Sequence, residues 1–359
     1  MTAATPLRAI DLFCGPGGLT QGLKQAKFTV VGGVEQEPIA CETYSRNHPE
    51  VRLWSDDIRD LSPSAVRTEL GLKPGDLDLL AGCPPCQGFS SLRTRNGKRV
   101  VDDGRNDLVM QMAVWAAEFR PRAILMENVP ALARDYRMDL LVEALEGLGY
   151  PARSSYRVVD AQEYGVPQRR RRLVLIAAHK EEIPISSSSY SRQTVRDAIG
   201  ELPPPGSSGD QLHDLPERRS PKVRDIISRI RKDGGSRKDL GEDQLECHKR
   251  LDGFYDIYGR MAWDGPAPTI TSGCSNPSKG RFLHPEQDRA ISLREAALLQ
   301  SFPRSYWFSL KGGKEAAALM IGNALPPRLV EAHGTVIRRY LEDRTGSAGC
   351  EPVVTADGG

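Results

Sequence analysis

The sequence predicts an α/β fold in which a mostly parallel β-sheet is covered by helices and followed by a second, smaller domain. Short apolar runs alternate with segments of helical periodicity through the first half of the chain. A glycine-rich turn, Gly15-Pro-Gly-Gly18, separates the first run from the first helical segment. The composition, 39% hydrophobic and 27% charged over 359 residues, excludes disordered, collagen-like and small disulfide-rich chains.

The expected strands follow the apolar runs in chain order. They comprise residues 7–13, 28–35, 76–82, 122–127 and 173–177. A further strand, third in the chain, is expected to end at Asp57-Ile58. The expected helices comprise residues 19–26, 38–47 and 138–148, with another on which Leu108, Met112, Trp115 and Phe119 recur at helical spacing. Alternation of this kind implies right-handed βαβ units, whose ligands collect at the carboxyl ends of the strands.

The character of the sequence changes after about residue 180, where the stretches 186–189, 203–205 and 206–209 interrupt it with serine, proline and glycine. This predicts a linker into a second, less regular domain. Residues 217–238 hold nine basic residues against three acidic ones. A charge run is more often a solvated helix than a nucleic-acid surface, so by itself it is weak evidence. Helical periodicity returns from Ser292, and a last helix is expected to open at 322–327 and run through Tyr340, before a glycine-rich tail after Arg344.

Net charge, cysteine spacing and apolar runs bear on the binding partners and the cellular location of the protein. With 49 basic and 47 acidic residues the net charge is +2, so a nucleic-acid surface would need local clustering. The seven cysteines have no paired spacing, and residues 1–8 lack the profile of a signal peptide. No apolar run reaches the roughly 18 residues of a membrane-spanning helix. We expect a cytoplasmic protein with no membrane segment.

The glycine-rich turn after the first strand predicts close approach of the backbone to a cofactor. The dinucleotide pattern G-x-G-x-x-G would need glycine at position 20, which is Thr20, so a different nucleoside-bearing cofactor is favoured. Glu35 ends the second expected strand about twenty residues past the glycines, where a carboxylate can accept hydrogen bonds from ribose hydroxyls. Asp57 would place a further acceptor near an adenine amino group, although alone it is more typical of a turn.

The segment Cys83-Pro-Pro-Cys86-Gln87 follows the expected strand 76–82, and its prolines restrict the backbone that leads into Cys86. This favours a thiol nucleophile at the ligand edge of the sheet. Other interpretations remain open at this point, since most free cysteines are buried small hydrophobes and C-x-x-C also occurs in zinc sites and redox pairs. No second C-x-x-C or H-x-x-x-H completes four zinc ligands, and we expect no metal.

Two neighbouring motifs favour the nucleophile. Glu127-Asn-Val-Pro130 ends the next expected strand, so its carboxylate is expected at the same sheet edge as Cys86. The segment 168–172, Gln-Arg-Arg-Arg-Arg, leads into another strand and offers guanidinium groups to the same area. A thiolate, an acid and a cation around one cavity are the set needed for covalent attack on an electron-poor ring.

With these residues in place, the chain resembles a DNA (cytosine-5)-methyltransferase nearly end to end. Seven motifs occur in the family's order, which is far more specific than any one of them. They are the segment 11–18, Glu35, Asp57-Ile58, Pro85-Cys86-Gln87, Glu127-Asn-Val, Gln168-x-Arg170-x-Arg172, and the C-terminal pair formed by 294–303 and Gly322-Asn323-Ala. Two positions depart from the family pattern, since Cys83 replaces the usual glycine and Gln36 stands where many members place an aromatic residue against adenine.

The resemblance implies S-adenosyl-L-methionine as the cofactor. The residues implied to bind it are Phe13, Gly15, Gly17, Gly18, Glu35, Asp57, Ile58 and Asn323. It also implies a covalent mechanism on a cytosine flipped out of the duplex. Cys86 adds to C6, Glu127 binds the N3/N4 edge, and Arg170 helps to hold the base, with Gln87 and Arg172 completing the catalytic set. C5 then takes the methyl group, and loss of the C5 proton with expulsion of Cys86 restores the ring. The polar, arginine-rich loop 91–107 is implied to close over the DNA.

The same resemblance implies a class I methyltransferase, Rossmann-like sheet. The expected catalytic domain comprises residues 1–182 and 316–345, and the expected target-recognition domain and hinge comprise 183–315, with a disordered tail at 346–359. Double-stranded DNA is the expected partner, and it would lie between the two domains. We expect a monomer that serves as the modification enzyme of a restriction-modification system, with a cognate endonuclease in the same cell.

Three alternative functions compete with this one. Cytosine-5 methylation of tRNA is the nearest, but the segment 201–264 is unlike the tRNA-modifying branch and no Cys-Phe-Thr sequence typical of it is present. A non-catalytic regulatory homologue that only binds DNA is disfavoured because Cys86, Glu127 and Arg170 are intact. A nicotinamide dehydrogenase is disfavoured by Thr20. The DNA sequence that is recognised does not follow from residue spacing.

Overall fold

The computed structural model describes residues 6–85, 104–187, 190–243 and 256–347. Cys86, Gln87 and residues 91–103 of the expected lid lie outside them, as do Cys247 and the expected tail from 348 onward.

A single β-sheet runs through the first half of the described chain. Its strands are β1 (Arg8–Leu12), β2 (Thr29–Val34), β3 (Arg52–Trp54), β4 (Leu79–Gly82), β5 (Ala123–Asn128), β6 (Tyr156–Asp160), β7 (Arg171–Ala178) and β8 (Glu181–Glu182). They lie in the order β3-β2-β1-β4-β5-β7-β6, with β8 paired to β7. The strands from β3 to β5 are parallel, whereas β7 is antiparallel to β5, β6 and β8. The predicted mostly parallel sheet is confirmed.

The order of the strands reverses between β1 and β4, because the chain leaves β1 toward β2 and returns to β1's other side at β4. In open α/β sheets, ligands bind at such a switch point, outside the carboxyl ends of the strands. The turns that follow β1 and β4 are the glycine-rich turn and the segment that leads to Cys86.

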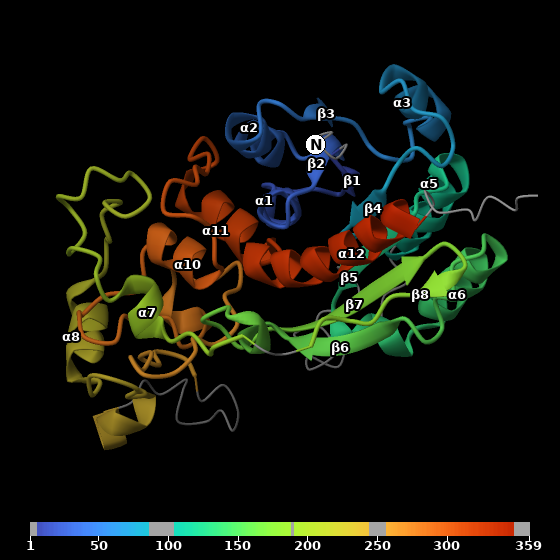
Figure 1. Ribbon diagram of the computed structural model, residues 1–359. Coiled ribbons are helices and arrows are strands. Elements are labelled where there is room, and N and C mark those ends of the chain that lie inside the picture. The colour runs from blue at the N-terminus through green and yellow to red at the C-terminus, as the bar shows by residue number, and fades with distance from the viewer. Residues whose placement is uncertain (1–5, 86–103, 188–189, 244–255, 348–359) are drawn as a thin grey trace, which may run out of the picture.

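Helices cover both faces of the sheet (Figure 1). On one face lie α1 (Gly18–Gln25) and α12 (Pro327–Ser347), which bury Leu23 and Leu329 in the same core as Ile176 of β7. On the other face lie α3 (Pro63–Glu69), α5 (Gln111–Phe119) and α6 (Tyr136–Gly147), which pack Trp115 and Leu141 against the sheet. The C-terminal helix α12 thus returns to the sheet that the first half of the chain builds.

The second part of the chain is less regular, as the sequence predicts. Its helices are α7 (Val195–Ile199), α8 (Pro221–Arg229), α10 (Leu293–Leu299) and α11 (Gly313–Asn323). The first, third and fourth share one apolar core with residues of α2 (Pro38–Asn47), while α8 packs into a smaller core of its own. Short 3-10 helices complete the described ranges at η2 (Gly104–Met110), η3 (Pro130–Arg134), η4 (Ala161–Tyr164), η5 (Arg237–Asp243) and η6 (Pro277–Lys279).

Two expectations about the elements are corrected by the structure, which also adds two strands. The third strand ends at Trp54 and not at Asp57-Ile58. Gly322 and Asn323 end α11, and the last helix begins only at Pro327. The edge strands β6 and β8 are additions that the sequence did not predict.

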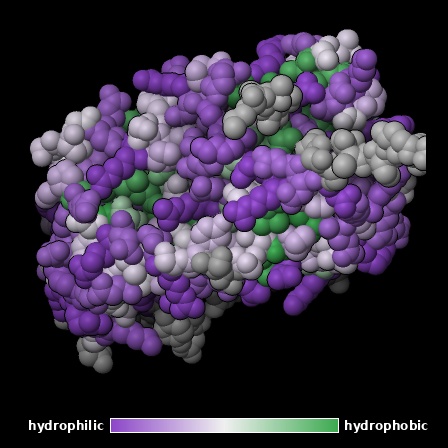
Figure 2. Space-filling model, viewed as in Figure 1, coloured by the Kyte–Doolittle hydropathy of each residue, from purple (hydrophilic) through white to green (hydrophobic). Residues whose placement is uncertain are grey.

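The surface in Figure 2 is mostly hydrophilic, with small and separate hydrophobic areas. No helix within the described ranges is long and apolar enough to cross a membrane.

Candidate active site

The glycine-rich turn between β1 and α1 adopts a left-handed backbone at three positions. Phe13 has φ 59°, Gly15 has φ 54° and Gly17 has φ 96°. A side chain at Gly17 would collide with the Tyr306 hydroxyl and the His48 ring, which lie within 2.6 Å of an ideal Cβ position. Phe13 is a non-glycine residue in a conformation that costs energy, which is typical of functional sites.

Hydrogen bonds from Tyr306 and His48, which lie on other parts of the chain, support the backbone of the turn. The Tyr306 hydroxyl donates to the Pro16 carbonyl oxygen at 2.6 Å and lies 2.9 Å from Nε2 of His48. Since that hydroxyl donates to Pro16, we assign the His48 proton to Nε2, which donates to Tyr306 and leaves Nδ1 to accept from Lys24 at 3.3 Å. Burial lowers the pKa of His48 to about 4, so its ring is neutral at pH 7.

Glu35 closes the side of the turn, where the sequence predicts it. Its Oε2 accepts a hydrogen bond from the Gly15 backbone N–H at 2.9 Å, and its Oε1 accepts from the N–H groups of Gln36 and Glu37 at 2.9 and 2.8 Å. Burial raises the pKa of Glu35, and these three hydrogen bonds act in the opposite direction. The carboxylate therefore fixes the turn and presents its remaining acceptor capacity at the sheet edge.

Asp11 lies fully buried under the turn. Its Oδ2 accepts from the Thr20 hydroxyl at 2.7 Å, whereas Oδ1 has no hydrogen-bond partner among the described residues. Burial raises the pKa of Asp11 to about 7. Thr20, which argues against a dinucleotide site in the sequence, thus has a structural role as the partner of Asp11.

Asp57 and Ile58 lie beyond the end of β3, in a turn. The Asp57 carboxylate forms an ion pair with Arg59, 2.5 Å from its guanidinium, and accepts from the Arg59 backbone N–H at 3.0 Å. These bonds lower the pKa of Asp57 to about 2. Ile58 is buried in the core beside Trp54. The segment still follows β3, which is the neighbour of β2 and Glu35.

The C-terminal segment returns to the glycine-rich turn. A side chain at Gly18 would meet the Leu325 carbonyl oxygen 2.3 Å from its Cβ, so only glycine allows this approach. Asn323 precedes Leu325 by two residues and has an exposed side chain. Gly322 packs in turn against the backbone of Thr271.

The segment that leads to Cys86 is anchored by the next strand. The Asn128 side-chain amide at the end of β5 donates to the Pro84 carbonyl oxygen at 3.1 Å, and its oxygen accepts from the Val129 N–H at 2.8 Å. Burial and the charge of the adjoining Glu127 raise the pKa of Cys83 well above its ordinary value. Because the thiolate is the nucleophilic form, Cys83 is a poor nucleophile.

Glu127 and Arg172 form the charged centre of the site. Nε of Arg172 lies 2.7 Å from Oε1 of Glu127, and their side chains are 15% and 11% exposed. The two residues reach each other from the antiparallel pair of β5 and β7. The pair is therefore largely removed from water, and each side chain keeps a small exposed surface.

Arg170 lies buried between the sheet and the second part of the chain. It is 2% exposed, and its guanidinium donates to the carbonyl oxygens of Ile270, Gly322 and Ala324 at 3.0, 3.0 and 3.2 Å. Its neighbour Gln168 is also fully buried and donates to Gln300 at 2.9 Å. Arg170 thus joins the sheet to the second part of the chain, and Arg172 is the arginine that contacts Glu127.

The turn, Glu35, Asp11 and the returning segment together fit a nucleoside-bearing cofactor. A Cβ at Gly15 would meet no described atom within 4 Å, Glu35 keeps acceptor capacity, and Asp11 has an unused buried oxygen. No group of three histidine, cysteine, aspartate or glutamate side chains within the described ranges is placed to hold a metal ion. Tyr306, His48 and Asn128 were not predicted as site residues, and only the position of Asn128 next to Glu127 gave a signal.

Comparisons with known proteins agree with this geometry. Residues 7–339 match the model of the C-5 cytosine-specific DNA methylase family. The chain is 38% identical to the Type II methylase M.HgiDII of Herpetosiphon aurantiacus over 93% of this chain and 95% of that protein. It is 32% identical to the Type II methyltransferase M.XorII of Xanthomonas oryzae pv. oryzae over 93% of this chain and 85% of that protein.

Solved structures share the fold. A DNA modification methyltransferase encoded within a prophage of E. coli aligns with a TM-score of 0.73 at 23% identity, over 94% of this chain and 99% of that one. The Dnmt2 methyltransferase of S. pombe aligns with a TM-score of 0.59 at 17% identity, over 94% of this chain and 99% of that one.

Proposed function

Because the chain belongs to the C-5 cytosine-specific DNA methylase family and is a DNA (cytosine-5)-methyltransferase, we propose that it transfers a methyl group from S-adenosyl-L-methionine to C5 of a cytosine flipped out of double-stranded DNA. The observation that carries the proposal is the Glu127–Arg172 pair at the carboxyl end of β5. It adjoins the anchored segment Pro84-Pro85, which leads directly to Cys86.

The cofactor would lie against the glycine-rich turn. Bound S-adenosyl-L-methionine supplies a methyl group on a positively charged sulfur. Phe13, Gly15, Gly17 and Gly18 shape the space for it, and Glu35 accepts a hydrogen bond from its ribose. The proposed contacts of Asp57, Ile58 and Asn323 rest on the family resemblance, and their positions after β3 and α11 are compatible with them.

The reaction begins when the Cys86 thiolate forms a bond to C6 of the flipped cytosine. Glu127 holds the N3/N4 edge of the base and favours protonation at N3, which draws electrons from C6. C5, made nucleophilic by this addition, would then take up the methyl group that the bound cofactor supplies from its sulfur. The C5 proton would pass to water and the N3 proton would return to Glu127, while the Cys86–C6 bond breaks and the thiolate is regenerated.

Arg172, held against Glu127, supplies the cation beside the reacting ring. Arg170 acts as a positioning residue, because its guanidinium is bound to three carbonyl oxygens at the seam of the two parts of the chain. Gln87, which follows the nucleophile in the sequence, completes the proposed catalytic set. This division of roles between the two arginines is more specific than the one expected from the sequence.

We further propose that residues 1–182 and 316–345 form the catalytic domain and residues 183–315 the target-recognition domain and hinge. In the structure α11 spans this boundary, since it begins at Gly313 and packs with α10. The protein would act as a monomer in the cytoplasm. The Type II relatives named above favour a role in a restriction-modification system with a cognate endonuclease.

Bisulfite sequencing of DNA from cells that express the protein tests this proposal, since it reports the modified base and its sequence context together. We expect 5-methylcytosine at one short recognition sequence and none in cells expressing Glu127→Gln. Modification confined to tRNA would instead favour the RNA branch of the same chemistry. Binding of duplex DNA without any methylation would favour a regulatory homologue.

A further inference from the structure

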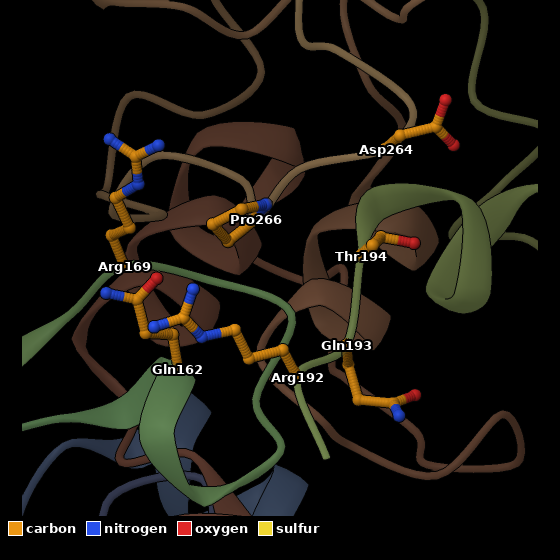
Figure 3. Close-up of a pocket in the computed structure, with 7 residues that line it drawn as sticks. All are labelled: Gln162, Arg169, Arg192, Gln193, Thr194, Asp264 and Pro266. Carbon is orange, nitrogen blue, oxygen red and sulfur yellow. The ribbon is translucent and has the colours of Figure 1, made fainter.

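A cavity of about 360 Å³ lies outside the site described above, on the seam between the two parts of the chain (Figure 3). Its lining comes from η4 (Gln162), from the segment before β7 (Arg169), from the segment before α7 (Arg192 and Thr194), and from Asp264 with its neighbour Pro266. Figure 3 shows the Arg192 side chain extending toward Gln162, while the Arg169 guanidinium points away from Arg192 and the Asp264 carboxylate points away from both arginines.

The lining of this cavity is positively charged. Asp264 is its one lining acid, and that carboxylate is engaged by Arg196, whose Nε lies 2.7 Å from it. Within the part of the chain that the structure describes, the guanidinium groups of Arg169 and Arg192 have no ion pair and no hydrogen bond. Two guanidinium groups offer up to ten N–H donors, and their planar shape suits the oxygens of a phosphate.

The backbones that carry the two arginines are fixed. The Arg169 N–H donates to the Ala267 carbonyl oxygen at 2.9 Å, and the Arg169 carbonyl oxygen accepts from the Thr269 hydroxyl at 2.7 Å. On the other wall, Thr194 caps α7 with a capping box, and the Val195 N–H donates to the Gly265 carbonyl oxygen at 2.9 Å. The cavity is therefore built by fixed main chain from which free cationic side chains project.

The cavity lies close to the proposed methylation site along the chain. Arg169 precedes Arg172, which contacts Glu127, by three residues. An extended chain advances about 3.3 Å per residue, so the two arginines are on the order of 10 Å apart. A DNA strand carries one phosphate per about 3.4 Å of helix axis, so a phosphate within about three nucleotides of a cytosine at Glu127 can reach the cavity.

We propose that Arg169 and Arg192 form a clamp for one phosphodiester of the bound DNA strand, within about three nucleotides of the target cytosine. This inference rests on the proposed function. The clamp joins the segment before β7 to the segment before α7, so a phosphate bound there would hold both parts of the chain on the same strand. Phosphate contacts of this kind fix register and orientation and carry no sequence information.

The test compares wild type with the double variant Arg169→Gln/Arg192→Gln in fluorescence-anisotropy titrations of a duplex across a salt series. Removing one phosphate contact should lower the slope of log affinity against log salt by about 0.9 and weaken binding about ten- to hundredfold. The matched control is Lys73→Gln/Lys180→Gln, which removes two exposed positive charges from the segments before β4 and after β7, away from the cavity. The control should leave the slope unchanged.

A second arm locates the contact on the DNA. Single phosphates near the target cytosine are replaced one at a time by uncharged methylphosphonates. Wild type should lose affinity at one position within three nucleotides of the cytosine, and the double variant should be insensitive at that position. An unchanged slope and an unchanged methylphosphonate profile in the double variant would overturn the clamp.

Two further outcomes separate the sources of phosphate and the two proposals. If inorganic phosphate binds wild type but not the double variant, while both bind DNA equally, the cavity serves a free anion and the DNA clamp is wrong. Methyl transfer to DNA by wild type is measured in parallel. If wild type transfers no methyl group to DNA, the proposed function is wrong. If wild type does transfer it, but the double variant binds DNA with the wild-type affinity and salt slope, only the clamp is wrong.

Discussion

The hydrogen bonds of Glu35 limit what its carboxylate can offer to a bound cofactor. An ionised carboxylate has about four acceptor sites, and backbone N–H groups occupy three of them in this structure. One site therefore remains, and we expect Glu35 to accept one hydrogen bond from a ribose hydroxyl. Loss of a hydrogen bond to a charged group costs about 1.5–3 kcal/mol, which corresponds to about ten- to a hundredfold in affinity.

The substitution Glu35→Gln tests this with little change in side-chain size. Calorimetric titrations use S-adenosylhomocysteine and its analogues that lack the 2′- or the 3′-hydroxyl. For wild type, removal of one of the two hydroxyls should lower the binding affinity about ten- to a hundredfold. Glu35→Gln should bind that analogue and the parent compound with about equal affinity. Glu37→Gln is the control, because it removes a charge two residues away whose side chain is exposed.

The pH dependence of cofactor affinity tests the role of the Glu35 carboxylate independently. Burial raises the pKa of Glu35, and the ionised form is the stronger acceptor for the hydroxyl. Cofactor affinity of wild type should therefore fall as the pH is lowered, beginning at a higher pH than an ordinary glutamate would require. This decline should be absent in Glu35→Gln. If the variant bound the parent compound as tightly as wild type and still distinguished the analogues, Glu35 would not be the ribose acceptor.

Three more predictions concern buried charge and the DNA surface. Burial raises the pKa of Asp11 to about 7 from the ordinary value of 3.8. Between these two pH values the folded state keeps a proton that the unfolded state has lost. The free energy of unfolding should therefore fall as the pH rises through this window, by at most about 4 kcal/mol. Urea unfolding across pH should show this slope for wild type and not for Asp11→Asn; equal slopes would contradict the assignment. Arg170→Met leaves three buried carbonyl oxygens without their donor and should lower the free energy of unfolding by about 3 kcal/mol or more. Unchanged stability together with lost DNA binding would instead indicate that Arg170 contacts the base. Arg218, Lys222 and Arg224 are exposed cations at and beside the start of α8. Neutralising them should reduce the slope of log DNA affinity against log salt by about 0.9 per phosphate contact. An unchanged slope would show that α8 is only a solvated helix.

The choice of cations on α8 illustrates what the structure adds to a charge count. Among the nine basic residues of 217–238, Lys232 is paired with Asp288 and Arg229 with Asp225, and Arg237 is buried. Composition showed an excess of charge, but only the fold shows which charges are already neutralised.

The central strands were predictable because they are buried on both faces. β5, for example, is buried along its whole length, so its sequence is a continuous apolar run that ends at a charged residue. The edge strand β6 buries only Val159 fully and leaves no such run. The third strand was extended too far, because Asp57 bonds the Arg59 backbone and forms a turn that the pattern of apolar residues does not mark.

The site was predictable where sheet topology alone decides position. Glu127 lies at the carboxyl end of β5 as expected, and Glu35 lies beside the glycine-rich turn. The roles of Arg170 and Arg172 could not be separated, because their partners come from segments up to 154 residues away. The support of Pro16 by Tyr306 likewise joins residues 290 positions apart, for which no local pattern exists.

Covalent capture of DNA by Cys86 tests the proposed mechanism most directly. A duplex that contains 5-fluorocytosine at the target position should become attached to the protein in the presence of S-adenosyl-L-methionine, because C5 fluorine cannot leave as a proton does. Peptide mapping should place the adduct on Cys86. Cys86→Ser should form none, while Cys83→Gly, which removes the thiol beside Glu127, should retain it. An adduct that survives in Cys86→Ser and disappears in Cys83→Gly would contradict the account.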